Sequence, residues 1–125
     1  MGFDLNGMKP KANSEKGTYF RNNVWWWRPL WNFVSTYCDD ILTETDIEMG
    51  SSNDCHKISK AKADKIAQRL NDLIDSGEVI KYEKQYRQHL DSLNDNDWNK
   101  NYPFDIRNVR DFADFCADSG GFIIG

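Results

Sequence analysis

The sequence has few of the residues and patterns that mark secreted, membrane-spanning or metal-binding proteins. It contains three prolines and three cysteines among 125 residues. Cys38, Cys55 and Cys116 cannot all pair within one chain, and none lies in a C-x-x-C spacing, so we expect reduced thiols. No apolar run approaches the roughly 20 residues of a membrane helix, and the amino terminus lacks a secretory signal pattern. These absences predict a soluble cytoplasmic protein.

Excess positive charge is also missing. The chain carries 16 Lys and Arg against 20 Asp and Glu, a net charge of −4. A protein that grips the backbone of a nucleic acid polymer relies on massed cationic side chains, so we do not expect such a partner. Charge is uneven, however, because residues 57–90 have a net charge of +3 and the remainder −7. The basic stretch could face an anionic ligand or an acidic surface of a second subunit, or its lysines could simply keep the helix exterior soluble.

Length and periodicity predict one mainly α domain that covers residues 1–125. Apolar residues recur at helical spacing after Pro29, after Ser59, after Gly77 and after Asp105, and a single helical turn fits between Thr43 and Gly50. The segments near Phe3 and Phe122–Ile124 are β-prone and are expected to pair with each other. The expected architecture is therefore a compact domain of four to five helices with a minor two-stranded β element from the two termini.

Aromatic residues are concentrated in one segment. Eight of the 17 aromatics lie between Tyr19 and Tyr37, and three consecutive indoles precede Pro29. Whether residues 25–27 are extended or helical, one buried face cannot hold all three rings. At least one indole is expected to line a pocket, a groove or a subunit contact, unless a segment such as residues 98–104 covers it. A purely structural cluster remains the alternative.

Polar residues beside these rings favour a binding role. Arg forms bidentate bonds to phosphate, Asn offers a donor and an acceptor to a base or ribose, and an indole offers a stacking face. The first amides of a helix beginning at Pro29 would also attract an anion. The structural alternatives are salt bridges from Arg to Asp39 or Asp40, and a turn at the asparagines. The candidate ligand-binding residues are Arg21, Asn22, Asn23, Trp25, Trp26, Trp27, Arg28, Trp31, Lys62 and Arg69.

No catalytic or metal-binding pattern emerges. Cys55 and His56 are neighbours whose side chains should point apart, and no spacing around His56 or His89 matches a zinc motif. The acids Asp111, Asp114 and Asp118 share one helix face, which is typical of a solvated surface. We therefore expect no metal, no cofactor and no enzymatic activity.

Six blocks of the sequence form a recognisable pattern, and the longest of them contains the three consecutive tryptophans. The blocks are residues 1–4, 20–31, 40–43, 59–67, 101–104 and 119–122. They resemble a group of small bacteriophage proteins, and the resemblance covers nearly the whole chain. Some members of that group carry a Cys-rich, zinc-knuckle-like insertion before the segment that matches Trp98, where this chain has only Asn94 to Asp97. Small phage proteins of this kind often look like counter-defence factors, including sponge proteins that sequester nucleotide signals of host immunity.

Together these observations suggest a non-enzymatic phage protein of the host-cell cytoplasm. The leading hypothesis is a homo-oligomer that sequesters a phosphate-containing nucleotide signal, such as a cyclic ADP-ribose variant or a cyclic dinucleotide. One alternative is an inhibitor that uses the Trp-rich patch as a hot spot against a host protein. The other is an enzyme that degrades the nucleotide.

Overall fold

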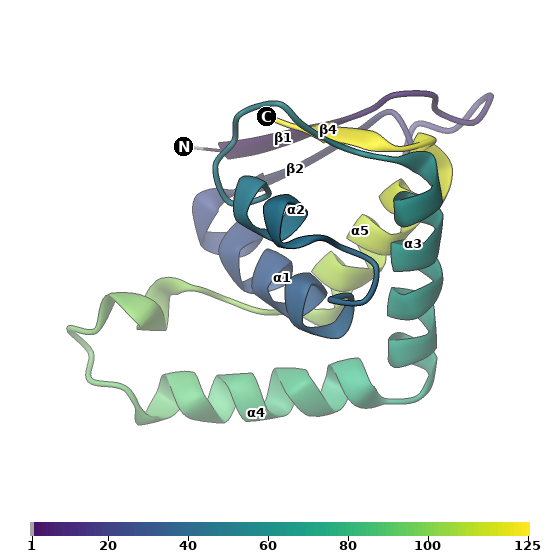
Figure 1. Ribbon diagram of the computed structural model, residues 1–125. Helices are drawn as coiled ribbons and strands as arrows, with labels where there is room; N and C mark the ends of the chain where they lie inside the picture. Colours follow the sequence, from purple (N-terminus) through teal and green to yellow (C-terminus); the bar gives the residue numbers. More distant parts are fainter. Residues whose placement is uncertain (1) are drawn as a thin grey trace.

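The computed structural model describes residues 2–125, which form a mainly helical domain with a small antiparallel sheet (Figure 1). The sheet lies along the top of the view, and α1, α2, α3 and α5 lie beneath it. The strands are β1 (Gly2–Gly7), β2 (Tyr19–Asn23), β3 (His56–Ile58) and β4 (Phe122–Ile124). The helices are α1 (Val24–Tyr37), α2 (Glu44–Met49), α3 (Lys60–Asp75), α4 (Glu78–Ser92), the 3-10 helix η1 (Trp98–Asn101) and α5 (Ile106–Ser119).

The sheet has the strand order β2-β1-β4-β3, with every pair antiparallel. The expected pairing of the two termini is confirmed, since Leu5 lies opposite Ile124. The expectation of two strands is wrong, because β2 and β3 extend the sheet at its two edges. An edge strand needs only one hydrogen-bonded neighbour, and β3 has three residues, too few to show an alternating pattern.

Helix α1 begins at Val24, five residues before the start that Pro29 indicated. Asn23 caps it by accepting a hydrogen bond from the backbone N–H of Trp26. Pro29 lies inside the helix even though proline disfavours helical geometry in the residue before it. Burial of Trp27, Leu30 and Trp31 on one helical face outweighs that local preference.

The remaining helix boundaries agree with the sequence signals. Thr43 forms a capping box with Asp46 at the start of α2, Ser59 caps α3, and Asp105 caps α5. Gly120 ends α5 in the left-handed conformation. These caps work through hydrogen bonds between residues two or three apart, so the sequence alone reveals them.

The core lies between the sheet and the helices beneath it. Aromatic rings make up much of it. Phe112, for example, lies at ring-centroid distances of 5.7 Å from Trp27 and 5.9 Å from Phe122. Cys38 and Cys116 are buried in the same cluster. Burial raises the pKa of the Cys38 thiol to about 12, which keeps it protonated and unreactive.

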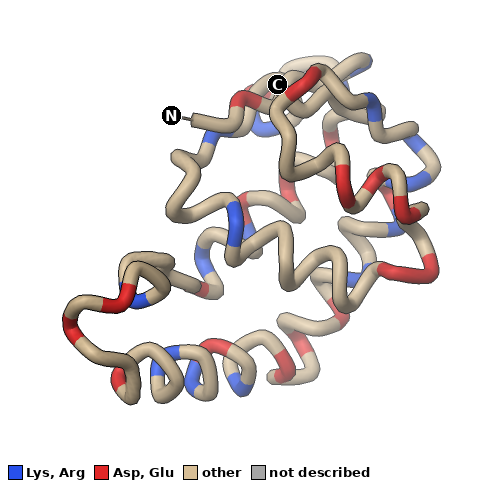
Figure 2. Tube along the Cα trace, turned by 60° about the vertical axis from the view of Figure 1, so that its left-hand side comes forward, with Lys and Arg blue, Asp and Glu red and all other residues tan. Residues whose placement is uncertain are grey.

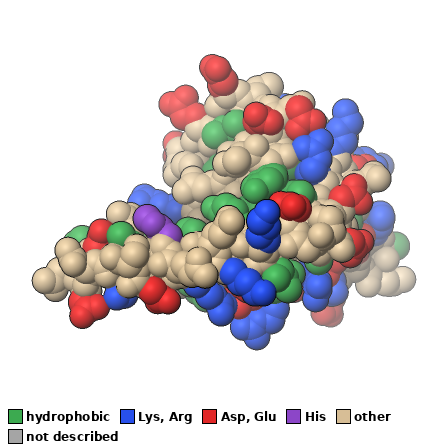
Figure 3. Space-filling view, turned by 90° about the horizontal axis from the view of Figure 1, so that it is seen from below, with side chains coloured by type: hydrophobic (Ala, Val, Ile, Leu, Met, Phe, Trp, Pro, Cys, Tyr) green, Lys and Arg blue, Asp and Glu red, His purple; other side chains and the backbone are tan. Residues whose placement is uncertain are grey.

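Residues 78–104, here called the arm, leave the body at Gly77 and return to it at Phe104. Gly77 has a φ of +85°, and α4 changes direction sharply from α3 at this point (Figure 1). The trace in Figure 2 shows Lys, Arg, Asp and Glu distributed along the arm. Seen from below, the arm carries intermingled basic and acidic side chains on its surface (Figure 3).

Within residues 2–125, no helix is long and apolar enough to cross a bilayer.

Candidate functional site

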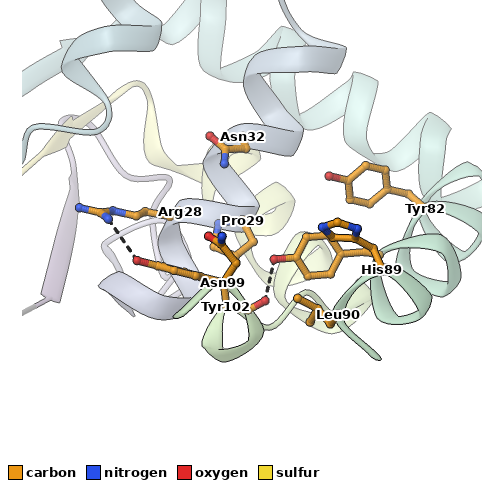
Figure 4. A pocket seen from close by; sticks show the side chains of 9 residues that line it. Arg28, Pro29, Asn32, Tyr82, His89, Leu90, Asn99 and Tyr102 are labelled. Atoms are coloured by element: carbon orange, nitrogen blue, oxygen red, sulfur yellow. Dashed lines mark hydrogen bonds between the residues drawn. The ribbon is translucent and has the colours of Figure 1, made fainter. Parts of the chain in front are cut away.

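A cleft between α1 and the arm holds a cavity of about 300 Å³ (Figure 4). Helix α1 contributes one wall, and α4, with the segment around η1, contributes the other. The lining residues are Arg28, Pro29, Asn32, Tyr82, Tyr86, His89, Leu90, Asn99 and Tyr102.

Helical spacing brings the cavity residues onto facing surfaces. Arg28 and Asn32 are four residues apart on α1, and Tyr82 and Tyr86 have the same spacing on α4, so each pair lies on one side of its helix. The ring of Tyr82 packs against Phe104 at a centroid distance of 4.7 Å, with Phe33 close by. This apolar floor fixes the arm against the body and leaves the cleft between them.

Two hydrogen bonds tie Tyr102 into the cleft. Arg28 donates to its phenolic oxygen at 3.1 Å, and the hydroxyl of Tyr86 donates to its backbone carbonyl at 2.6 Å. Figure 4 shows both bonds as dashed lines, with Arg28 and His89 on opposite sides of the view. Across the described chain no carboxylate pairs with Arg28, and no acidic residue lines the cavity. The guanidinium therefore has no acidic partner among the described residues, and most of its N–H donors are free for a ligand.

The polar rim of the cavity has spare hydrogen-bonding capacity. The side chains of Asn32, His89 and Asn99 and the hydroxyl of Tyr82 make no hydrogen bond to another group among residues 2–125. Burial raises the pKa of Tyr82 and raises that of Tyr86 to about 12, so both phenols stay neutral donors at pH 7. The rim thus offers donors and acceptors beside aromatic walls.

The structure divides the tryptophans of the aromatic segment between core and surface. Trp27 and Trp31 are 0% and 1% exposed and stack on each other. Their indole N–H groups donate to the carbonyls of Gly50 and Ile47, each at 2.9 Å. Neither ring is open to a ligand in this structure, in contrast to the stacking role expected for them.

Trp25 and Trp26 are half-buried and lie on different sides of α1. Trp25 stacks on Trp98 and packs against Tyr102, at the outer end of the cleft. Trp26 borders a second, more open hollow, whose other lining residues are Asn22, Asp105, Arg107, Asn108 and Asp111. The sequence argument that one buried face cannot hold three consecutive indoles agrees with this arrangement. Trp27 is buried, whereas Trp25 and Trp26 are partly exposed.

The polar residues before α1 do not converge on the cleft. Arg21 pairs with Asp4 across the β1–β2 ladder at 3.2 Å. Asn22 exchanges two side-chain hydrogen bonds with Asn108, and Asn23 caps α1. The helix does not start at Pro29 as expected, because α1 begins at Val24. The free backbone amides expected there to attract an anion are therefore not at Pro29.

Lys62 and Arg69, the two candidates on α3, are engaged elsewhere on the body. Arg69 makes a bidentate pair with Asp40 at 2.8 and 2.9 Å and donates to the carbonyl of Tyr37. Lys62 lies 2.5 Å from Asp46, a carboxylate that also contacts His56 at 2.8 Å. Neither residue is among the groups that line the cleft cavity.

Asp46 is the one buried carboxylate among the described residues. Burial acts to raise its pKa, but hydrogen bonds from Lys62, His56 and the backbone of Thr43 outweigh that effect and lower the pKa to about 2. Because these partners belong to α2, β3 and α3, the network fixes α2 against the body. Within residues 2–125, no three His, Cys, Asp or Glu side chains are placed to hold a metal ion.

None of the cleft residues on the arm is in the sequence-based candidate list. Tyr82, Tyr86 and Leu90 fit the apolar stripe of a helix, and Tyr102 was considered only as a cover for the tryptophans. The available signal is their hydroxyl groups, since a tyrosine on an apolar helix face needs a partner or water for its O–H. Of the expected ligand residues, Arg28 alone lines this cavity.

Comparison with known proteins yields no relative for this chain. No protein-family model matches the sequence, and neither the search of curated proteins nor the search of solved structures found a match.

Proposed function

We propose that this protein binds a small phosphate-bearing molecule with a planar ring, of the nucleotide class, in the cleft between α1 and the arm. The observation that carries this proposal is the position of Arg28, an arginine without a carboxylate partner beside an aromatic-walled cavity. A guanidinium with free donors recognises phosphate, and tyrosine rings accept a planar ring by stacking.

The size of the cavity limits the ligand. A volume of about 300 Å³ is at the lower end of the range for small-molecule sites, which suits roughly one nucleotide unit. The unpaired amides of Asn32 and Asn99 supply donors and acceptors for the edges of a base or ribose. These features favour a nucleotide over an apolar ligand.

Sequestration rather than turnover is the proposed mechanism. The amides and neutral phenols around the cavity hold a ligand but do not exchange protons with it near pH 7. His89 also lines the cavity, but among residues 2–125 no carboxylate or other group forms a hydrogen bond that would orient its ring as a general base. The resemblance to small phage proteins extends this proposal to a nucleotide signal of host immunity, with the host-cell cytoplasm as the place of action.

Isothermal titration calorimetry with AMP, cyclic ADP-ribose and a cyclic dinucleotide tests the proposal. We expect at least one of them to bind, and Arg28→Ala to weaken that binding by roughly 10- to 100-fold, since a hydrogen bond to a charged group is lost. Arg110→Ala is the matched control, because Arg110 is exposed on α5 and lies outside the cavity. Absence of heat with every nucleotide would contradict the proposal.

Recovery of the ligand separates sequestration from catalysis. Excess protein is incubated with the nucleotide that binds and is then denatured by heat. We expect the nucleotide to be released unchanged, as chromatography would show. A new product that Arg28→Ala fails to form would instead establish the degrading enzyme.

A further inference from the structure

Trp98 presents an open aromatic face at the outer end of the cleft. Its exposed fraction is 72%, the largest among the exposed large apolar side chains of the described residues. Its ring lies against Trp25 with centroids 5.9 Å apart and planes inclined by 12°. One face of the Trp98 indole is therefore covered, and the opposite face is free.

The ring is backed by a supported scaffold. Trp25 is itself packed against Tyr102 at a centroid distance of 4.9 Å. The turn of η1 is held at its start by Asp97, which accepts from the backbone N–H of Asn99, and at its end by Lys100, which contacts Asp95 at 2.9 Å. These contacts hold the backbone of η1, and the stacking on Trp25 orients the indole before any ligand arrives, which limits the entropy lost on binding.

The surroundings of Trp98 distinguish a single-ring platform from a protein-binding hot spot. Residues 94–97 and 99–101 are all Asn, Asp or Lys. The other large apolar side chains that are exposed, Met8, Tyr19 and Ile80, belong to other segments of the chain. A hot spot needs a surrounding ring of contacts that exclude water, and a partner-binding patch covers several hundred Å². One flat ring in polar surroundings instead matches one flat ring of a ligand.

Trp98 does not line the cleft cavity itself but adjoins residues that do. Asn99, its neighbour in η1, lines the cavity, and Tyr102 contacts both the cavity and Trp25. A ligand held by Arg28 and the tyrosines can thus extend along the rim to the free indole face.

We propose that Trp98 stacks on a second planar ring of the ligand, which makes the ligand a dinucleotide. One nucleotide unit occupies the cavity, and the base of the other lies on Trp98. This inference rests on the proposed function, because the second ring is joined to the unit that the cavity holds.

Two synthetic ligands with two phosphates each test the inference by calorimetry. The dinucleotide pApA has two adenine rings, and adenosine 3′,5′-bisphosphate has one. We expect the wild-type protein to bind pApA about tenfold or more tightly than the bisphosphate, in line with the energy of stacking one base on an aromatic side chain. Trp98→Ala should lower the affinity for pApA to that for the bisphosphate, whereas Trp98→Phe should retain most of the preference.

The outcomes separate this inference from the function on which it rests. If wild-type protein and Trp98→Ala bind pApA equally well, the second-ring site is wrong and the cleft site stands. If neither ligand binds the wild-type protein, both are wrong for adenine nucleotides of this kind. Sedimentation velocity adds a further check, since a wild-type dimer that Trp98→Ala dissociates would assign the indole to a subunit contact and overturn the inference.

Discussion

Two stacked pairs of tryptophans occupy opposite environments in this protein. Trp27 and Trp31 lie 5.3 Å apart with planes inclined by 15°, and Trp25 and Trp98 lie 5.9 Å apart with planes inclined by 12°. We call them the inner pair and the outer pair. The inner pair is buried, and both of its N–H groups donate to carbonyls, whereas Trp98 in the outer pair is mostly exposed.

The difference shows that stacking geometry alone does not reveal the role of an aromatic pair. What separates the pairs is α2, which covers the inner pair and supplies Ile47 and Gly50 as acceptors. The outer pair has no such cover over Trp98, and it packs against Tyr102, which lines the cleft cavity. The inner pair accordingly stabilises the fold, whereas Trp98 leaves an exposed indole at the surface.

Removing an inner ring should have the largest effect on stability. Trp27→Ala leaves a cavity in the core and leaves the carbonyl of Gly50 without its donor, so we expect a loss of about 4 kcal/mol in the free energy of unfolding. Urea denaturation followed by circular dichroism measures it. If the variant does not fold, Trp27→Phe should fold with a smaller loss, because it keeps an aromatic ring. A loss below about 1 kcal/mol for Trp27→Ala would end the distinction between the pairs.

Disturbing the contact between α2 and the inner pair should come next. A Cβ on Gly50 would collide with the indole of Trp31, because α2 and α1 approach closely at this point. Gly50→Ala should therefore lower the free energy of unfolding by about 2 kcal/mol through overpacking. Ser51→Ala is the matched control, since Ser51 is exposed in the adjacent position, and its effect should stay within about 0.5 kcal/mol. Urea denaturation measures both variants, and equal urea midpoints for Gly50→Ala and Ser51→Ala would argue against this close packing.

The Asp46 network, which fixes α2 from its other side, should respond to pH. The folded-state pKa of Asp46 is about 2, below the usual 3.8, so its contribution is present above about pH 4 and is lost as the pH falls toward 2. The shift corresponds to roughly 2 kcal/mol. Asp46→Asn should lower stability at pH 7 by about that amount and flatten the loss of stability between pH 5 and 2.5.

A surface ion pair provides the control for that measurement. Asp64 pairs with Lys60 on the exposed face of α3, so Asp64→Asn should change stability at pH 7 by less than about 0.5 kcal/mol. Urea midpoints at several pH values compare both variants with the wild-type protein. If the stability of the wild type and that of Asp46→Asn change with pH in parallel, Asp46 is not the group whose protonation lowers the stability in acid.

Removing the outer ring should have the smallest effect. Trp98→Ala loses the stacking contact with Trp25 but exposes little new surface, because Trp98 is 72% exposed in the folded state. We expect a change of less than about 1 kcal/mol in the free energy of unfolding. Thermal melting of this variant beside Trp27→Phe gives the comparison directly. A loss larger than that of Trp27→Phe would assign the outer pair a structural role.

The sequence by itself determined the mainly helical class, most helix boundaries and the pairing of the terminal strands. Caps such as Ser59 and Asp105 act over two or three residues, and apolar periodicity marks the buried face of each helix, so local patterns carry this information. The same local reasoning failed at Pro29, where the burial of Trp27 and Trp31 outweighed the preference of a single proline.

Only the tertiary structure decided which tryptophans are buried and where the cleft lies. The acceptors for Trp27 and Trp31 come from α2, 23 and 16 residues away, and Arg28 meets Tyr102 across 74 residues. Such contacts depend on how α2 and the arm pack against α1. The sequence revealed that three consecutive indoles could not share one buried face, but packing between distant segments chose the ring that is buried.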